Sequence, residues 1–180
     1  IDQCVGSAAI WTTSEQTNVL ASGRMGELVA FDGTTGVELW SVNHGLPCDA
    51  DPTVDPTNGN VYLPVGFESI RIVGVTAAGQ PLWSEAAVPV FDYQEGVNDR
   101  QRAQSAGCLA HDGRAYYFQT VSEEGDGALY AIDTTNGAVR WFYPTGSKGW
   151  EVPASAPIVT ENGVIIVGNN YGGMYFALRD

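Results

Sequence analysis

An eleven-residue phrase occurs twice in this chain, as AFDGTTGVELW from Ala30 to Trp40 and as AIDTTNGAVRW from Ala131 to Trp141. A degenerate copy, IRIVGVTAAGQPLW, ends at Trp83, and a fourth copy begins as GGMYFALRD and stops at Asp180. A period of roughly 43–58 residues indicates a repeat architecture, in which each unit packs against its neighbours. This repeat constrains the fold more than any other feature of the sequence.

Each phrase has the pattern of a β-hairpin that ends in a large aromatic residue. Leu28 and Ala30 occupy alternate positions, as in a half-buried strand with one face toward a core. The Asp-x-x-x-Gly that follows is turn chemistry, because Asp accepts bonds from nearby backbone N–H groups and Gly adopts positive φ. Two more strand-like pieces precede each hairpin, and no stretch has helical periodicity. Four short strands per unit predict an all-β propeller made of four-stranded antiparallel blades.

We expect one domain over residues 1–180, with blades at approximately 4–43, 48–86, 105–143 and 154–180. The last of these units lacks an outer strand, so we expect about four blades that form the C-terminal half of a seven- or eight-bladed ring. A complete four-bladed ring is the alternative. A half-ring would expose apolar edges that invite pairing with the remaining half or with another copy.

The phrase Ala-x-Asp-x-x-Thr-Gly-x-x-x-Trp resembles the tryptophan-docking motif of the PQQ-type (quinoprotein-like) β-propeller repeats. The resemblance covers essentially the whole chain, although the second unit is degenerate and the fourth is truncated. It implies that Trp40, Trp83 and Trp141 pack against the next blade. It also implies that Ala30 and Ala131 leave room for the indole rings.

Acidic residues outnumber basic ones by 21 to 8, which gives a net charge of −13. Such a charge repels phosphate backbones and anionic headgroups, so we expect no nucleic-acid partner. No apolar run approaches the roughly 18 residues that cross a bilayer, so we expect no membrane insertion. The acidic residues either solvate the surface or reflect a saline or extracellular habitat.

The expected ligand-binding segments are the connections between blades, at residues 41–51, 84–107 and 142–155, and the shorter loops at residues 66–69 and 121–126. Loops of more than about a dozen residues are often functional, and the second is the longest of the three. Its polar side chains could supply oxygen ligands to Ca²⁺, or the loop could be a solvated insertion. The third loop could stack a planar ligand or a sugar, or its Trp could close the central channel. The candidate residues are Asp92, Glu95, Asn98, Asp99, Arg100 and Arg102 in the second loop, and Lys148, Trp150 and Glu151 in the third.

The three cysteines have no CxxC and no metal-ligand spacing. Cys4 and Cys48 occupy equivalent repeat positions, so a disulfide between them is a hypothesis, whereas Cys108 is expected to be a small buried hydrophobic residue. His44 and His111 are expected to be structural or exposed. Nothing marks a nucleophile or a catalytic triad, so we predict no catalytic residue and no metal site.

The resemblance implies two classes of function. The first, which we favour, is a non-catalytic scaffold, periplasmic or secreted, that binds a protein partner or the rest of the propeller and needs no cofactor. The second is part of a dehydrogenase that oxidises alcohols or sugars with PQQ and Ca²⁺. Those enzymes often contain a disulfide of adjacent cysteines, and no Cys-Cys pair occurs in this sequence. A third class, glycan lyases and hydrolases, needs paired carboxylates that the sequence does not place.

Overall fold

The computed structural model describes residues 7–84, 87–149, 155–169 and 172–180. These residues form sixteen strands in four antiparallel sheets. The first sheet contains β1 (Ala9–Thr12), β2 (Thr17–Ser22), β3 (Glu27–Asp32) and β4 (Glu38–Asn43). The second contains β5 (Thr53–Val54), β6 (Val61–Val65), β7 (Ser69–Val75) and β8 (Ala87–Asp92). The third contains β9 (Gln101–Ala103), β10 (Cys108–Leu109), β11 (Ala115–Ser122), β12 (Gly127–Asp133) and β13 (Val139–Ser147). The fourth contains β14 (Ile158–Val159), β15 (Val164–Gly168) and β16 (Tyr175–Arg179).

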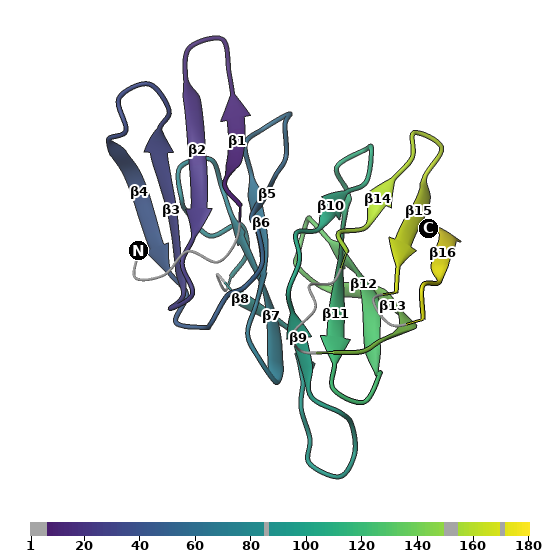
Figure 1. Ribbon diagram of the computed structural model, residues 1–180. Coiled ribbons are helices and arrows are strands. Elements are labelled where there is room, and N and C mark those ends of the chain that lie inside the picture. The colour runs from purple at the N-terminus through teal and green to yellow at the C-terminus, as the bar shows by residue number, and fades with distance from the viewer. Residues whose placement is uncertain (1–6, 85–86, 150–154, 170–171) are drawn as a thin grey trace.

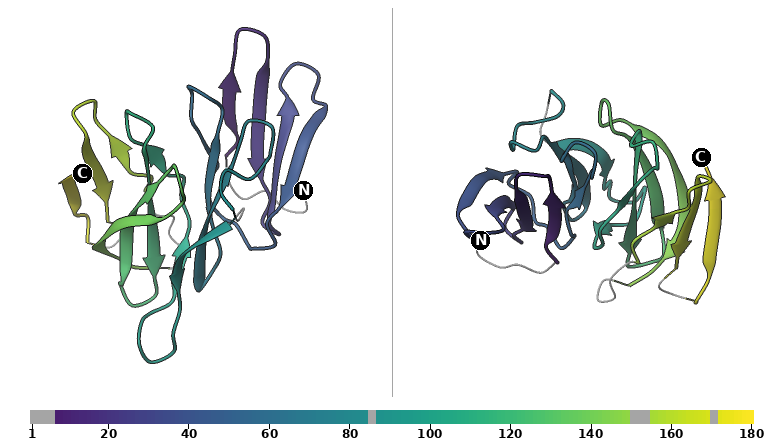
Figure 2. Two further views of the ribbon diagram at one scale, coloured as in Figure 1. Left: turned by 180° about the vertical axis from the view of Figure 1, so that it is seen from behind. Right: turned by 90° about the horizontal axis from the view of Figure 1, so that it is seen from above.

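The four sheets have the arrangement of propeller blades. Within each sheet the strands pair in chain order, except that β9 pairs with β11 beside β10. The first strands of neighbouring sheets lie together, since β1 contacts β5 and β10 contacts β14. The sheets follow one another side by side from the N-terminal to the C-terminal end (Figures 1 and 2). The predicted all-β fold is therefore confirmed as a partial propeller, whose fourth sheet has three strands among the described residues.

The hairpin turns use the Asp and Gly of the repeated phrase as predicted. Asp32 Oδ1 accepts bonds from the backbone N–H groups of Thr34 and Thr35, at 2.8 and 2.7 Å. The bonds from Thr35 lower the pKa of the Asp32 carboxyl, because they stabilise its ionised form. Gly36 has a φ of 71°, in the region that only Gly enters at little cost. Asp133 caps its own turn in the same way. Both Asp residues therefore serve turns.

Each interface between neighbouring sheets contains its own apolar cluster. The side chains come from the two facing sheets in each case, as expected when every unit packs only against its neighbours. Burial of this apolar surface, at roughly 25 cal/mol per Å², is what holds the sheets together. Fully buried members of the three clusters, in order, are Leu28 and Leu63, Ile72 and Phe118, and Leu129 and Ile165.

The repeated Trp residues bond to the following sheet, as the resemblance implied. Trp40 Nε1 donates to the carbonyl oxygen of Ala77 at 2.9 Å. Trp83 Nε1 donates to the carbonyl oxygen of Thr134 at 3.1 Å. Both acceptors lie in the turn between the third and fourth strands of the next sheet. Trp141 reaches the fourth sheet through a side-chain acceptor instead.

A small residue lies opposite each docking Trp on the neighbouring strand. Ala30 and Ala131 pair with their Trp residues and are almost completely buried, as predicted. In the second sheet Gly74 has this role, and a Cβ there would lie 2.5 Å from the ring of Trp83.

Two strands lie where the sequence analysis expected loop. β8 follows Trp83 instead of ending at it, so the second sheet extends to Asp92, beyond the expected boundary at residue 86. Pro81 explains the difference, because it has no N–H to donate and pairs with Val75 only as an isolated bridge. The outer strand then begins again at Ala87. β9 also falls within the expected 84–107 loop, and β13 extends to Ser147, into the expected 142–155 loop.

No helix in the described ranges is long and apolar enough to cross a membrane.

Candidate functional site

The inter-sheet connections and the β2–β3, β6–β7 and β11–β12 loops gather at one end of the sheets, as a meander requires (lower end in Figure 1). The β8–β9 loop extends beyond the others at this end. It contains most of the predicted site residues, so this end is the first candidate site.

The β8–β9 loop is fastened to the β11–β12 loop of the third sheet. Asp99 Oδ2 accepts the backbone N–H of Glu124 at 2.8 Å, and Gln101 Nε2 donates to the carbonyl oxygen of Asp126 at 3.0 Å. Between the two loops lies an open pocket of about 390 Å³. Its lining residues are Tyr93, Gly96, Val97, Asn98, Asp99, Arg100, Glu123, Glu124 and Asp126.

Arg100 is held in place by two neighbours of different chemistry. Its guanidinium lies 5.2 Å from the centre of the Tyr93 ring, and Nη1 lies 3.2 Å from Oε1 of Glu68. The contact with Tyr93, and secondarily the Glu68 carboxylate, raises the pKa of Arg100. Because both ion-pair partners are about half exposed, at 52% and 48%, the pair orients the loop more than it stabilises the fold.

Three of the predicted residues, Asn98, Asp99 and Arg100, meet in this pocket. Asp92 does not join them, since it forms an ion pair with Arg71 at 2.8 Å. Glu95 belongs to the same loop but is not among the lining residues.

Lys148 lies beside the β11–β12 loop. It forms an isolated β-bridge with Ser122, and the backbone N–H of Gly149 donates to the carbonyl oxygen of Ser122 at 2.9 Å. Trp150 and Glu151 lie outside the described residues. Glu123, Glu124 and Asp126 lie in the expected 121–126 loop, but the sequence analysis did not choose them individually, and it did not choose Tyr93. The run Glu-Glu-Gly-Asp between two strands was the signal that could have identified the three acidic residues.

No three His, Cys, Asp or Glu side chains in the part of the chain that the structure describes are placed to hold a metal ion. In the loop pocket, Asp99 is already committed to the Glu124 and Arg100 backbone N–H groups. The pocket between the two loops is therefore an open acidic surface. It also contains one apolar side chain, Val97, which is 74% exposed.

Among the loops at this end, Arg102 links three sheets. It belongs to β9 and forms an ion pair with Asp49, in the connection from the first sheet to the second. Its guanidinium lies 4.0 Å from the centre of the Phe67 ring, in the β6–β7 loop. Arg24, from the first sheet, contacts the same Asp49 at 3.4 Å. Arg102 was predicted as a loop residue, and its observed contacts indicate a structural role.

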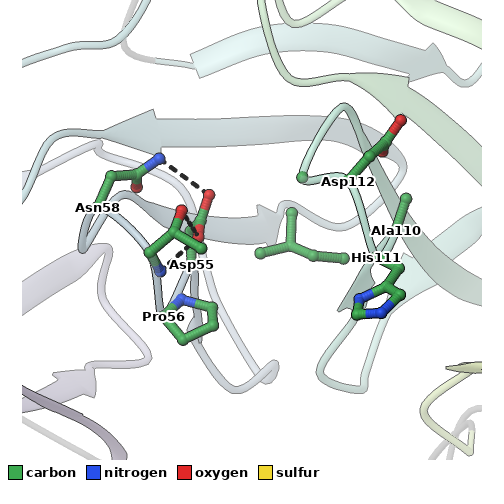
Figure 3. Close-up of a pocket in the computed structure, with 9 residues that line it drawn as sticks. Asp55, Pro56, Asn58, Ala110, His111 and Asp112 are labelled. Atoms are coloured by element: carbon green, nitrogen blue, oxygen red, sulfur yellow. Dashed lines mark hydrogen bonds between the residues drawn. The ribbon is translucent and has the colours of Figure 1, made fainter. Parts of the chain in front are cut away.

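A second pocket, of about 370 Å³, lies at the opposite end of the sheets, between the β5–β6 and β10–β11 turns. Asp55 and Asn58 face His111 and Asp112 across it (Figure 3). The Asp55 carboxylate accepts three bonds from Thr57 and Asn58, within its own turn. Asp55 therefore stabilises its turn.

Cys48 is a buried thiol, and Cys108, which was expected to be buried, is half-buried. Burial raises the pKa of Cys48 to about 11 and that of Cys108 to about 12. Cys48 Sγ donates to the carbonyl oxygen of Ala50 at 3.4 Å. Cys4 lies outside the described residues, so the Cys4–Cys48 pairing stays a prediction.

Comparison with known proteins gives a consistent architecture. A family model described as "Outer membrane protein assembly factor BamB" matches residues 5–179. The serine/threonine-protein kinase AfsK of Streptomyces coelicolor is 29% identical over 124 residues, which are 66% of this chain and 12% of the kinase. Protein Rv3035 of Mycobacterium tuberculosis is 27% identical over 183 residues, which are 90% of this chain and 42% of that protein.

Among solved structures, BamB from Moraxella catarrhalis has a TM-score of 0.59 at 20% identity, covering 98% of this chain and 50% of that one. This likeness shows the fold alone. The chain spans less than half the length of the two curated relatives, at 42% and 12%.

Proposed function

Because the chain belongs to the PQQ_2 family, described as that of the outer membrane protein assembly factor BamB, we propose that it is a non-catalytic, extracytoplasmic scaffold. It would bind a protein partner or the rest of a propeller. The family description supports both the assembly role and the location outside the cytoplasm. The net charge of −13 supports a protein partner over a nucleic acid.

The observation that carries the proposal is an unoccupied docking turn on the first sheet. In the second and third sheets the turn Gly is covered by the preceding Trp, since a Cβ on Gly79 would lie 2.7 Å from Trp40 and one on Gly137 2.8 Å from Trp83. Gly36 has the same place in its turn and a similar φ, 71° against 74° at Gly79. No described residue lies within 4 Å of a Cβ at Gly36.

Exposed apolar side chains lie in and beside this turn and also on the first strand of the same sheet. Val37 is 61% exposed, Leu39 is 41% exposed and Ile10, on β1, is 67% exposed. Exposed apolar groups that adjoin a preformed docking geometry are typical of a protein-binding surface. The occupant that fits is another sheet of the same repeat type, whose Trp would reach the Gly36 turn as Trp40 reaches that of Gly79.

Sedimentation velocity of the chain over a wide concentration range tests this surface. We expect concentration-dependent association that Leu39→Asp weakens at least about tenfold, because a charge would be buried at the contact. Met25→Asp is the matched control, since Met25 is 64% exposed but belongs to the β2–β3 loop at the other end. A chain that stays monomeric throughout, or an equal effect of both variants, would contradict the proposal.

The non-catalytic part of the proposal has its own test. The chain is mixed with PQQ and Ca²⁺, and quinone absorbance and alcohol-dependent dye reduction are followed. We expect neither quinone binding nor dye reduction. Either signal would contradict the non-catalytic proposal and support the dehydrogenase alternative.

A further inference from the structure

The Asp180 carboxylate receives three donors from the third sheet. Trp141 Nε1 donates to Oδ1 at 2.7 Å, and the Tyr117 hydroxyl donates to Oδ2 at 2.8 Å. Arg140 Nη1 lies 3.0 Å from the same Oδ2. An indole N–H, a phenol and a guanidinium thus converge on one carboxylate, and charge-assisted bonds of this kind are the strong ones in proteins.

This arrangement differs from the other two sheet interfaces. There the docking Trp donates to a main-chain carbonyl, and here it donates to a side chain. The residue before the docking Trp is Leu39 in the first sheet and Leu82 in the second, but Arg140 in the third. The third sheet therefore has a cation at a repeat position that is apolar elsewhere.

Tyr117 supplies the phenol donor. It pairs with Ala131 in the register, where Leu20 pairs with Ala30 in the first sheet and Tyr62 pairs with Gly74 in the second. Burial raises the pKa of the Tyr117 hydroxyl, so it remains a protonated donor at neutral pH. Arg140 is therefore the residue that distinguishes the third sheet, and together with Tyr117 and Trp141 it gives this surface the donors of an anion receptor.

The carboxylate is reachable from solvent on two sides. Asp180 lines a pocket of about 330 Å³ beside the β10–β11 turn and another of about 400 Å³ beside the β13 aromatic residues. Its side chain is 22% exposed. A small carboxylic acid could therefore enter if the Asp180 side chain were removed.

We propose that Tyr117, Arg140 and Trp141 form a carboxylate-binding site on the third sheet, and that Asp180 is its intramolecular ligand. The fourth sheet is then held in place partly by a displaceable carboxylate. The site takes a monocarboxylate that carries no bulky group next to the charge.

Chemical rescue tests the site. Asp180→Ala is expected to lower the melting temperature of the full chain by roughly 4–10 °C, because it leaves charged and polar donors unpaired. Sodium acetate should restore part of this loss, relative to sodium chloride at equal ionic strength. The rescue should disappear when Tyr117→Phe is added, because the phenol donor is then missing. Asp32→Ala is the matched control: the Asp32 carboxylate caps its own turn and accepts one bond from the Gln16 amide at 3.3 Å, so acetate should not rescue that variant.

An unchanged melting temperature in Asp180→Ala, or a loss that acetate restores no better than chloride, would overturn the proposal. If Asp180→Ala does not fold, hydrogen exchange of Asp180→Asn in the full chain gives an independent answer. The β15 amides should then exchange faster than in the unmodified chain while those of β2 do not change. Equal protection of β15 in both proteins would also overturn it.

Discussion

At the scale of single residues, contacts between one Gly and one Trp connect the sheets. Gly79 combines a φ of 74° with a Trp40 ring so close that a Cβ would lie 2.7 Å from it. Gly36 has almost the same φ but no described neighbour within 4 Å of a Cβ. Comparison of Gly79 with Gly36 therefore separates the free-energy cost of backbone strain from that of steric overlap with Trp40.

We therefore predict that Gly79→Ala destabilises the chain more than Gly36→Ala does. Both variants incur about 1–2 kcal/mol for a left-handed Ala, and Gly79→Ala adds about 1–3 kcal/mol of overpacking against Trp40. Urea unfolding of the two variants measures the difference. Equal losses would mean that the Trp40 ring moves aside at no cost.

His44 makes stability depend on pH. Burial lowers its pKa from 6.5 to about 4, so the unfolded chain binds a proton first as the pH falls. The contribution of neutral His44 is therefore complete above pH 6.5 and is lost between pH 6.5 and 4, by about 3 kcal/mol in all. Urea unfolding at pH 7 and pH 4.5 should give a smaller loss for His44→Gln than for the unmodified chain. His111→Gln is the control and should leave the loss unchanged.

At the scale of elements, the interrupted first strand of the third sheet depends on Arg102. β9 pairs with β11 for three residues, and Gln101 and Arg102 also contact the β6–β7 loop through Glu68 and Phe67. The Arg102 and Asp49 side chains are only 16% and 10% exposed. Breaking a buried ion pair is costly, and here Arg24, at 3.4 Å from Asp49, compensates part of the charge that remains.

We predict that Arg102→Ala destabilises the chain by about 2–3 kcal/mol, because Arg24 still compensates part of the Asp49 charge. Arg71→Ala, which removes a pair with the 54% exposed Asp92, should cost at most about 1 kcal/mol. Hydrogen exchange should also show faster exchange at Thr120 to Ser122 in Arg102→Ala only. Similar losses in the two variants would show that β9 is held by its backbone bonds alone.

These elements also show what the sequence could predict. The hairpins of the first and third sheets were predictable, because alternation, an Asp cap and a turn Gly are all local signals. β8 was missed because the strand residues AVPVFD follow the docking Trp, which was taken as the end of the unit. The loop pocket was only partly predicted. Asn98 and Asp99 belong to one loop, but their meeting with Glu123 and Glu124 depends on how two sheets are placed side by side.

At the scale of the whole molecule, charge opposes compactness. The net charge of −13 is spread over 180 residues with only 8 basic side chains. A compact chain of one sign repels itself, and this repulsion is weaker in the expanded unfolded state. The acidic pocket at the loop end adds to the effect, because Asp99, Glu123 and Glu124 lie together there.

We predict that salt stabilises this protein. The Debye length falls from about 30 Å at 0.01 M to about 3 Å at 1 M, so added NaCl screens repulsion across the whole surface. The melting temperature should therefore rise with NaCl, and a Glu123→Gln/Glu124→Gln variant should be more stable than the unmodified chain at low salt. The difference between the two proteins should shrink as salt is added, because screening removes the repulsion that the variant lacks. A melting temperature that falls with salt would mean that ion pairs such as Arg100–Glu68 outweigh the net repulsion. In that case the stability of this acidic propeller would depend on how its charges are paired and not on its net charge.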